Sequence, residues 1–248
     1  MIRAMYSAAS GMSAQELAVD NIAHNLANAG TSGYKSETVA FRSAPVQGPG
    51  LPTRAYAVAS STGADLSGGS VQRTGRDLDV AVSGSGFIAV QARDGTEAYT
   101  RDGGFELDTD GQLQTRSGLP VLGEGGPITI PQDSVVSIGR DGTVSVTTNG
   151  QSLANVTVVG QIKLANPQRA DIVKGSDGLF RTRSGAPADT DPAVELVSGA
   201  VEGSNVNAVA SMVDMINLAR QFDMHMKMLQ NVDGNAQRAT QLLTTSAS

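Results

Sequence analysis

Apolar residues near both ends of the chain recur at intervals of three and four, which is the spacing of one side of an α-helix. At the N-terminal end this pattern covers residues 2–26 and stops at the loop-like composition Asn28-Ala29-Gly30. At the C-terminal end it covers residues 206–243 without a proline. We therefore expect a helix at each end, with Ser204 or Asn205 as the N-cap of the second.

Between the two helical patterns, short alternating or apolar runs are typical of strands. Asp-Gly pairs punctuate them, and glycine accepts the positive φ of a tight hairpin turn. The expected strands are Leu78–Val82, Phe87–Gln91, Phe105–Leu107, Ile128–Ile130, Val135–Ile138, Thr143–Thr147 and Val156–Leu164. The Asp-Gly pairs begin at Asp94, Asp102, Asp110, Asp141 and Asp177. This arrangement predicts an antiparallel sheet or partial barrel, preceded by an extended connector over Arg42–Ser70.

Each helical stripe must be covered, and the simplest cover for two helices at opposite ends of a sequence is each other. We expect an α+β fold in which long terminal α-helices pair as a coiled-coil core, with an inserted β-rich antiparallel domain. Separate packing of each helix on the β part is the alternative. The expected segments are an N-terminal helical core segment (1–35), an extended connector (36–75), a β-rich outer domain (76–202) and a C-terminal helical core segment (203–248).

Composition excludes several partners. The 248 residues carry a net charge of -6, which disfavours nucleic acid and anionic membranes, and no run approaches the roughly 18 apolar residues of a membrane span. We expect no direct membrane insertion. A signal peptide needs a continuous apolar stretch, which Arg3, Gln15, Glu16 and Asp20 interrupt, so we expect any export to proceed without a cleaved signal peptide.

Three candidate chemical motifs have simpler explanations. Gly84–Ala89 fits a dinucleotide-binding pattern, but a strand follows where a helix is required, so a hairpin turn is expected. Glu106–Gly111 resembles the start of a calcium loop, but its twelfth position is Ser117, so a hairpin is expected here too. His24 and His225 have no second histidine or cysteine nearby. We expect no catalytic residues, metal, cofactor or small-molecule substrate.

Three blocks of sequence, taken together and in this order, resemble the rod and hook family of bacterial flagellar axial proteins. The first block is residues 25–28 with 31–35, the second is 76–87 continuing through 99–103 and 111–118, and the third is 199–206 leading to Met215, Ile216, Arg220, Phe222 and Lys227. Residues 42–46 and 60–65 are most similar to the proximal-rod members of the family, with the distal-rod members as the near rival.

The resemblance implies paired terminal helices in an inner core and a β-rich outer domain. It also implies a structural subunit of the proximal rod, a self-assembling part of the drive shaft in the periplasm-spanning basal body. Expected partners are other copies of the chain, neighbouring rod proteins and the flagellar type III export apparatus. The expected subunit-interface residues are Ile2, Met5, Met12, Val19, Leu26, Asn25, Asn28, Val209, Met212, Ile216, Phe222, Met226, Leu229 and Leu243.

A competing hypothesis from another class is a periplasmic β-domain enzyme or binding protein with a helical oligomerisation stalk. It requires a concave pocket with perturbed acids in the β domain. Asp108, Asp110 and Glu124 are the acids whose substitution tests it.

Overall fold

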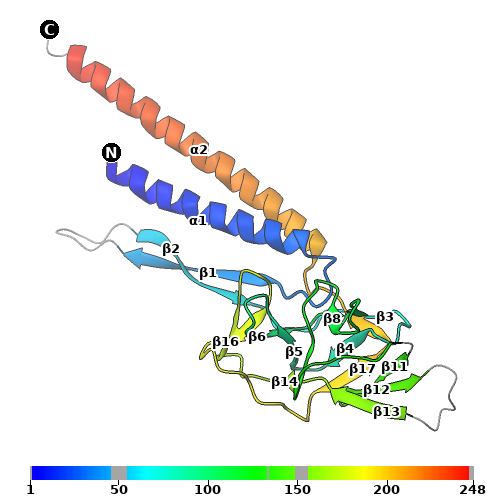
Figure 1. Ribbon diagram of the computed structural model, residues 1–248. Helices are drawn as coiled ribbons and strands as arrows, with labels where there is room; N and C mark the ends of the chain where they lie inside the picture. The colour runs from blue at the N-terminus through cyan, green and yellow to red at the C-terminus, as the bar shows by residue number, and fades with distance from the viewer. Residues whose placement is uncertain (1, 46–54, 133, 149–155, 246–248) are drawn as a thin grey trace. The chain divides into compact units, whose positions relative to one another are not determined.

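Two helices lie near the ends of the chain, and strands lie between them (Figure 1). The computed structural model describes residues 2–45, 55–132, 134–148 and 156–245. Helix α1 spans Ile2–Ala27 and helix α2 spans Ala208–Thr245. Neither described helix combines the length and apolar character needed to cross a bilayer.

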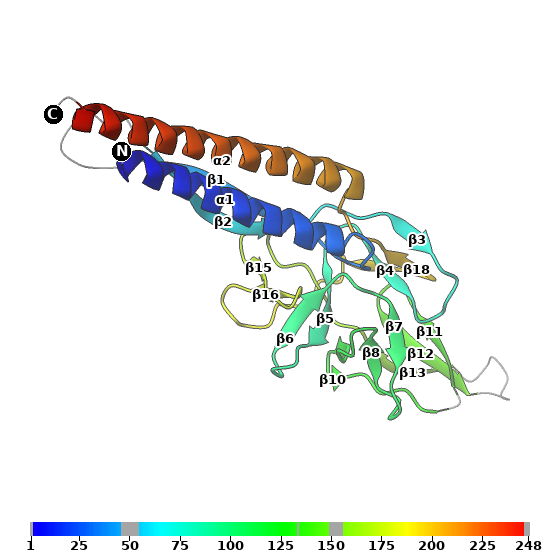
Figure 2. The same ribbon diagram turned by 90° about the horizontal axis from the view of Figure 1, so that it is seen from above.

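The first of two compact units contains both helices and one two-stranded sheet. It comprises Met1–Ala27, Glu37–Gly63 and Asn207–Ser248. Strand β1 (Glu37–Pro45) pairs with strand β2 (Ala55–Ala64), inside the segment expected to be an extended connector. Helices α1 and α2 run antiparallel beside each other (Figures 1 and 2), and α1 also contacts β1.

The expected coiled-coil core of paired terminal helices is wrong. The two helices have unequal lengths of 26 and 38 residues, and the only buried side chains described on them are those of the polar residues Gln15 and Asn25. A coiled coil needs a continuous row of buried apolar side chains from both helices. None of the described apolar side chains of α1 and α2 is buried, so the hydrophobic core of this chain lies in its β-rich part.

The start of α2 also differs from expectation. The backbone N–H of Ala210 donates to Asn207 Oδ1 at 3.0 Å, which makes Asn207 the N-cap. Ser204 instead accepts a hydrogen bond from the backbone N–H of Val206, before the helix begins. The prediction of Ser204 or Asn205 as the cap was therefore wrong by two to three residues.

The second unit comprises Asn28–Ser36 and Ala64–Val206 and is built from small antiparallel sheets, as expected for the middle of the chain. One five-stranded sheet has the order β14 (Leu164–Ala165), β5 (Phe87–Gln91), β6 (Glu97–Thr100), β16 (Phe180–Thr182) and β15 (Ile172–Lys174). A three-stranded sheet has the order β11 (Ser134–Ile138), β12 (Thr143–Thr148) and β13 (Val156–Gln161). Strand pairs complete the unit: β17 (Glu195–Ser198) with β4 (Val80–Ser83), β18 (Ala200–Glu202) with β3 (Val71–Arg73), β7 (Phe105–Leu107) with β8 (Leu113–Thr115), and β9 (Leu122–Gly123) with β10 (Gly126–Pro127).

Aliphatic side chains from most of these sheets fill one core. Strand β11 shows how the period of two produces it, because Val136 and Ile138 are buried while Val135 is exposed. Val80 and Val90, from β4 and β5, are fully buried in the same core. Burial of such side chains typically stabilises a fold by about 1.5–3 kcal/mol each.

The turn chemistry was largely predictable. The glycine has a positive φ in four of the Asp-Gly pairs, namely those at Gly95, Gly111, Gly142 and Gly178. The pair Asp102-Gly103 is different, because Gly103 lacks a positive φ and a Cβ there would collide with the backbone of Val80. Ile128–Ile130 does not form the expected strand, since only Thr129 makes an isolated bridge, to Gln112.

One of the two motif-like segments, the calcium-loop-like one, is a hairpin connection as expected, whereas the hairpin expected at Gly84–Ala89 is wrong, because β4 pairs with β17 and β5 belongs to the five-stranded sheet. The glycines at 84 and 86 lie between β4 and β5, where no helix follows. The calcium-loop-like segment forms the β7–β8 turn, in which the backbone N–H of Asp108 donates to Gln112 O at 3.0 Å.

Candidate functional site: a buried anchor and an exposed helix face

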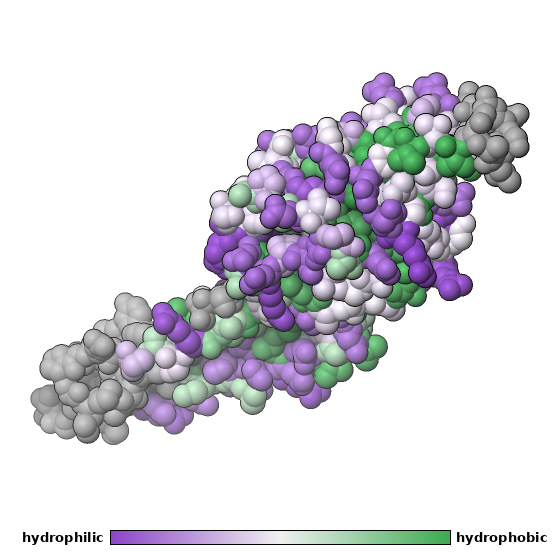
Figure 3. Space-filling view, turned by 90° about the horizontal axis from the view of Figure 1, so that it is seen from below, coloured by the Kyte–Doolittle hydropathy of each residue, from purple (hydrophilic) through white to green (hydrophobic). Residues whose placement is uncertain are grey.

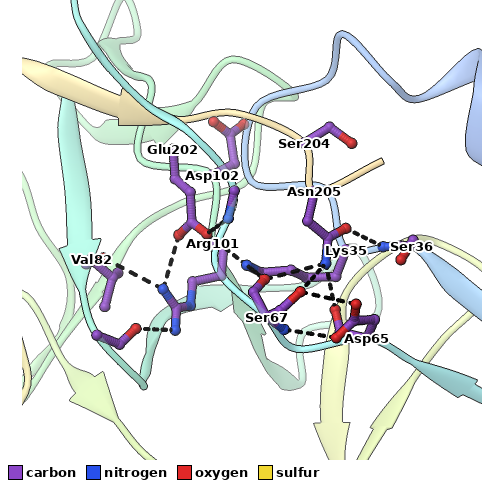
Figure 4. Close-up of polar contacts among 12 residues, drawn as sticks. Lys35, Ser36, Asp65, Ser67, Val82, Arg101, Asp102, Glu202, Ser204 and Asn205 are labelled. Atoms are coloured by element: carbon purple, nitrogen blue, oxygen red, sulfur yellow. Dashed lines mark hydrogen bonds and ion pairs between the residues drawn. The ribbon is translucent and has the colours of Figure 1, made fainter. Parts of the chain in front are cut away.

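Three charged side chains from distant parts of the chain meet inside the β-rich unit (Figure 4). Lys35 Nζ lies 2.6 Å from Glu202 Oε1, and Arg101 Nη1 lies 2.9 Å from Glu202 Oε2. All three residues are at most 4% exposed. A carboxylate held between two cations in this way is stable only when the remaining donors and acceptors are also satisfied.

Backbone groups supply most of those remaining partners. Lys35 Nζ donates to Ser67 O at 2.6 Å, and Arg101 Nη2 donates to Gly84 O at 2.6 Å. The backbone N–H of Gly69 donates to Glu202 Oε1 at 2.8 Å. The network therefore joins the segment that follows α1, the segment that follows β2, the β4–β5 turn and the segment that precedes α2.

The network shifts the pKa values of two of its members. Burial lowers the pKa of Lys35 below its usual 10.5, although hydrogen bonding to Glu202 partly opposes this. Burial alone would raise the pKa of Glu202. The hydrogen bonds from Lys35 and Gly69 and the charge of Arg101 outweigh burial, so the pKa of Glu202 lies below its usual 4.5. Glu202 is thus ionised at neutral pH and serves as the counterion for both cations.

Asn205 extends this anchor toward α2. Its Oδ1 accepts from the backbone N–H of Ser36 at 2.7 Å, and its Nδ2 donates to Asp65 O at 2.8 Å (Figure 4). Asn205 was expected to satisfy backbone groups at a helix end, but it joins two connecting segments instead. The segments next to both helices are therefore fixed within the β-rich unit.

Asn25 has an equivalent role within the helical unit. Its Oδ1 accepts from the backbone N–H of Glu37 at 2.8 Å, while its Nδ2 donates to Glu37 O at 2.9 Å. This pair of bonds copies the pattern by which one strand pairs with another, and it attaches the start of β1 to α1. Asn25 is therefore an internal link, and its place at a subunit interface stays a prediction.

The remaining interface candidates on the N-terminal segment are mostly half-buried. Met12, Val19 and Leu26 lie on α1, and Asn28 follows the helix, where its Oδ1 accepts from Thr31 Oγ1 at 3.2 Å. The side chains of Ile2, Met5 and Leu243 lie outside the described part of the structure.

The candidates on α2 are the most exposed apolar side chains of the set. Val209, Met212 and Ile216 are between 51% and 72% exposed. Phe222 and Met226 are about 40% exposed, and Leu229 is half-buried. Exposed apolar side chains gathered on one helix are typical of interaction surfaces, and the interface assignment of these residues stays a prediction.

A second group of exposed apolar side chains lies on the β-rich unit. Val135, Val156 and Val158 share the outer face of the β11–β12–β13 sheet, where Thr147 pairs with both Val135 and Val156. Figure 3 shows hydrophobic residues gathered at the upper right of the view. The alternation of valines in β11 and β13 is the sequence signal for this exposed face, which is absent from the candidate sites expected from the sequence.

The charged anchor was also missed by sequence reasoning. Lys35 and Glu202 are 167 positions apart and belong to no periodic pattern. The available signal was a single charged residue inside each of two otherwise small or apolar segments, at Tyr34-Lys35 and Val201-Glu202. That signal is common in proteins and does not identify the partner of either residue.

Asp141 and Asp191, two acids beside a depression of the β-rich unit, accept hydrogen bonds from nearby residues of the same turns. A depression of about 330 Å³ is lined by Glu124, Asp141 and Asp191 among others. Hydrogen bonds from Thr143 lower the pKa of Asp141, the opposite of what a general acid needs. No group of metal-ligating side chains occurs among the described residues.

Comparison with known proteins finds matches along most of the chain. Residues 5–35 match the family model of a flagella basal body rod protein, residues 81–146 match the flagellar hook protein FlgE/F/G D1 domain, and residues 197–242 match the flagellar basal body rod FlgEFG protein C-terminal model. The flagellar basal-body rod protein FlgF of Escherichia coli (strain K12) is 45% identical over 230 residues, covering 90% of this chain and 91% of the relative. The chain belongs to the flagellar basal-body rod protein family.

Two further relatives, one FlgF and one FlgG, show to which kind of rod protein the chain is more similar. FlgF of Salmonella typhimurium is 44% identical over 90% of this chain and 91% of its own length. FlgG of Buchnera aphidicola subsp. Schizaphis graminum is 35% identical over 98% of this chain and 100% of its own length. This rod protein is therefore more similar to these FlgF proteins than to that FlgG. Because the family consists of structural rod proteins, the chain is a structural protein and not an enzyme.

Proposed function

We propose that this rod protein is a structural subunit of the proximal rod of the flagellar basal body, and that it joins neighbouring subunits through its terminal helices. The higher identity to two FlgF proteins supports the proximal position. The observation that carries the assembly role is the exposed apolar surface of α2, because water-exposed valine, methionine and isoleucine at helical spacing gain free energy when a neighbour covers them.

The buried anchor has a defined part in this function. A rod transmits torque, so each subunit must hold its assembling helices firmly. The network of Lys35, Arg101 and Glu202 fixes the segment that follows α1 and the strand that precedes α2 within the β-rich unit. Because its side chains are buried, the network resists the screening by salt that weakens surface ion pairs.

The expected partners are other copies of this chain, neighbouring rod proteins and the flagellar export apparatus. The candidate interface residues with described side chains on α2 are Val209, Met212, Ile216, Phe222, Met226 and Leu229. Met12, Val19 and Leu26 on α1 are half-buried and contribute less free surface.

A charge placed on the α2 surface tests the assembly role. Ile216→Asp or Leu229→Asp should abolish motility and remove the chain from purified basal bodies, because a carboxylate would be buried without a partner. Val173→Asp, at a position of similar exposure on β15, is the control that should leave motility intact. Normal motility in the Ile216→Asp strain would contradict the proposal.

The position within the rod needs a separate measurement. Site-specific crosslinking from α2 in purified basal bodies should attach this chain to proximal-rod neighbours. Attachment to hook-side neighbours alone would assign it to the distal rod instead.

A further inference from the structure

Helix α2 has two apolar sides, and only one of them faces α1. Gln15 Nε2 of α1 donates to Leu218 O of α2 at 2.6 Å, which marks the side of α2 in contact with α1. Successive residues of a helix are about 100° apart, so Val209, Val213 and Ile216 lie on the opposite side. These residues, with Met212, form what we call the outer face of α2, and each is at least 51% exposed.

The outer face of α2 becomes charged toward its C-terminal half. Arg220, Asp223 and Lys227 follow Ile216 on the same side of the helix, and all three are exposed. The face therefore consists of about two apolar turns followed by a region with one more positive than negative charge.

Helix α1 has a complementary outer face. Ser13, Glu16, Leu17 and Asp20 lie on the side of α1 away from Gln15, and all four are exposed. Leu17 is the one large apolar side chain of this group, at 38% exposed. These four residues make the outer face of α1 acidic around a single leucine, and His24, further along the same side, lies 3.3 Å from Glu37 Oε2. The outer face of α2 is apolar and then basic.

We propose that the outer face of α2 receives the outer face of α1 from a second copy of this chain, with the two helices parallel. The inference rests on the proposed function and specifies the partner of that surface. Complementary charge supports this choice of partner, because Glu16 and Asp20 on the α1 outer face are acidic and Arg220 and Lys227 are basic.

The spacing of the charges sets the direction of the helices. When Leu17 packs on Ile216, a parallel arrangement brings Asp20 beside Arg220. Asp20 lies three positions after Leu17, and Arg220 lies four positions after Ile216. An antiparallel arrangement would place the uncharged Ser13 beside Arg220 instead. The parallel arrangement also places Lys227 next to the C-terminal end of the incoming α1, where a positive charge is favoured by the helix dipole.

The two faces belong to one chain but are different surfaces, so the contact is heterologous. Heterologous contacts do not close on themselves in pairs, and they generate rings or helical arrays. A chain that presents an acceptor face on α2 and a donor face on α1 can therefore add copy after copy in one direction.

Cysteine crosslinking tests the contact directly, because the natural chain has no cysteine. Full-length chains carrying Leu17→Cys and Ile216→Cys would be co-expressed, and purified basal bodies would be oxidised. We expect a disulfide-linked dimer that requires both variants. Leu17→Cys combined with Met228→Cys is the control and should give no dimer, since Met228 lies about 18 Å further along α2.

Charge reversal tests the register. Asp20→Arg alone and Arg220→Asp alone should each lower the yield of the Leu17–Ile216 disulfide about fivefold, because repulsion replaces attraction. Combining the two reversals in one chain should restore the yield. Asp214→Arg, on the side of α2 away from the outer face, is the matched control and should have no effect.

The outcomes separate this inference from the proposed function. Basal bodies that contain both cysteine variants but no disulfide between them would overturn the inference and leave the rod assignment standing. A disulfide with a homologous rod protein in place of the second copy would overturn it as well. Basal bodies that lack the chain altogether would contradict the proposed function and the inference with it.

Discussion

Lys35 and Glu202 form a buried ion pair at 2.6 Å, although they are 167 positions apart in the sequence. Lys35 lies in the segment that follows α1, and Glu202 is the last residue of strand β18, which precedes α2. Both side chains are at most 2% exposed. If one of the two residues is removed, the charge of the other stays buried, where water cannot solvate it. The pair therefore joins the segment that follows α1 to strand β18 within the β-rich unit, and its loss has measurable consequences.

Glu202→Ala should destabilise the β-rich unit by about 3–5 kcal/mol, because Lys35 and Arg101 would remain buried without a counterion. Urea unfolding monitored by circular dichroism measures the change. Glu195→Ala removes an exposed glutamate from neighbouring strand β17 and should cost less than about 0.5 kcal/mol. Equal effects of the two substitutions would show that the buried network contributes nothing beyond a surface charge.

The ion pair also predicts a pH dependence. The pKa of Glu202 in the folded chain lies below its usual value of 4.5, so the ionised form is favoured by folding. Its stabilising contribution is complete above pH 4.5 and is lost as the pH falls through the folded pKa. The unfolding free energy should therefore fall on acidification below pH 4.5.

Glu202→Gln separates this effect from that of other carboxylates. Hydrogen bonds also lower the pKa values of Asp65, Asp94, Asp141 and Asp177, so part of the acid sensitivity will persist in the variant. The slope of stability against pH should nevertheless become shallower than in the natural chain. An unchanged slope would mean that Glu202 is not the titrating group.

Gly33→Ala should destabilise the chain strongly, by about 3 kcal/mol or more, for two reasons. Gly33 has a φ of 67°, and a Cβ there would collide with the backbone of Arg101 and Asp102. Gly30→Ala is the matched control in the same turn, since a Cβ at Gly30 meets nothing within 4 Å. Thermal melting of both variants should show a large loss for the first and almost none for the second.

The β-rich unit was largely predictable because its signals are local. The period of two predicted β5 and β7 with their correct bounds, and the Asp-Gly turns followed from glycine's tolerance of positive φ. The helices were predictable as helices, but the absence of a buried apolar seam between them was not. A periodic stripe shows which residues share one side, and Val209, Met212 and Ile216 do so, yet that side faces away from α1.

The contacts that fix the segments beside the helices were not predictable for a related reason. The network of Lys35, Arg101 and Glu202 depends on which connecting segments come together, and no spacing in the sequence records that. Asn25 illustrates the same limit. Its type suggested a polar role near a helix end, but its pairing with the backbone of Glu37 requires β1 to lie against α1.

Asn25→Ala should loosen the attachment of β1 to α1. Two hydrogen bonds to the backbone of Glu37 are lost, and each buried group left unpaired costs about 1–3 kcal/mol. Amide hydrogen exchange should accelerate in residues 37–45 and stay unchanged in the β5–β6 hairpin. Asn231→Ala, at an exposed position on α2, is the control. Unchanged exchange in β1 would show that other contacts hold the strand.

The unequal distribution of buried apolar side chains predicts unequal stability within the monomer. The described side chains of α1 and α2 include no buried apolar residue, whereas the β-rich unit contains a large aliphatic core. Local stability follows burial, so the helices of a dilute monomer should exchange their amide hydrogens much faster than β4, β5 and β12. Assembly should then slow exchange most strongly along the outer face of α2, at Val209, Met212, Val213 and Ile216. Fully protected helices in a dilute monomer would contradict this, because a helix already stable alone gains no order when a neighbour covers it.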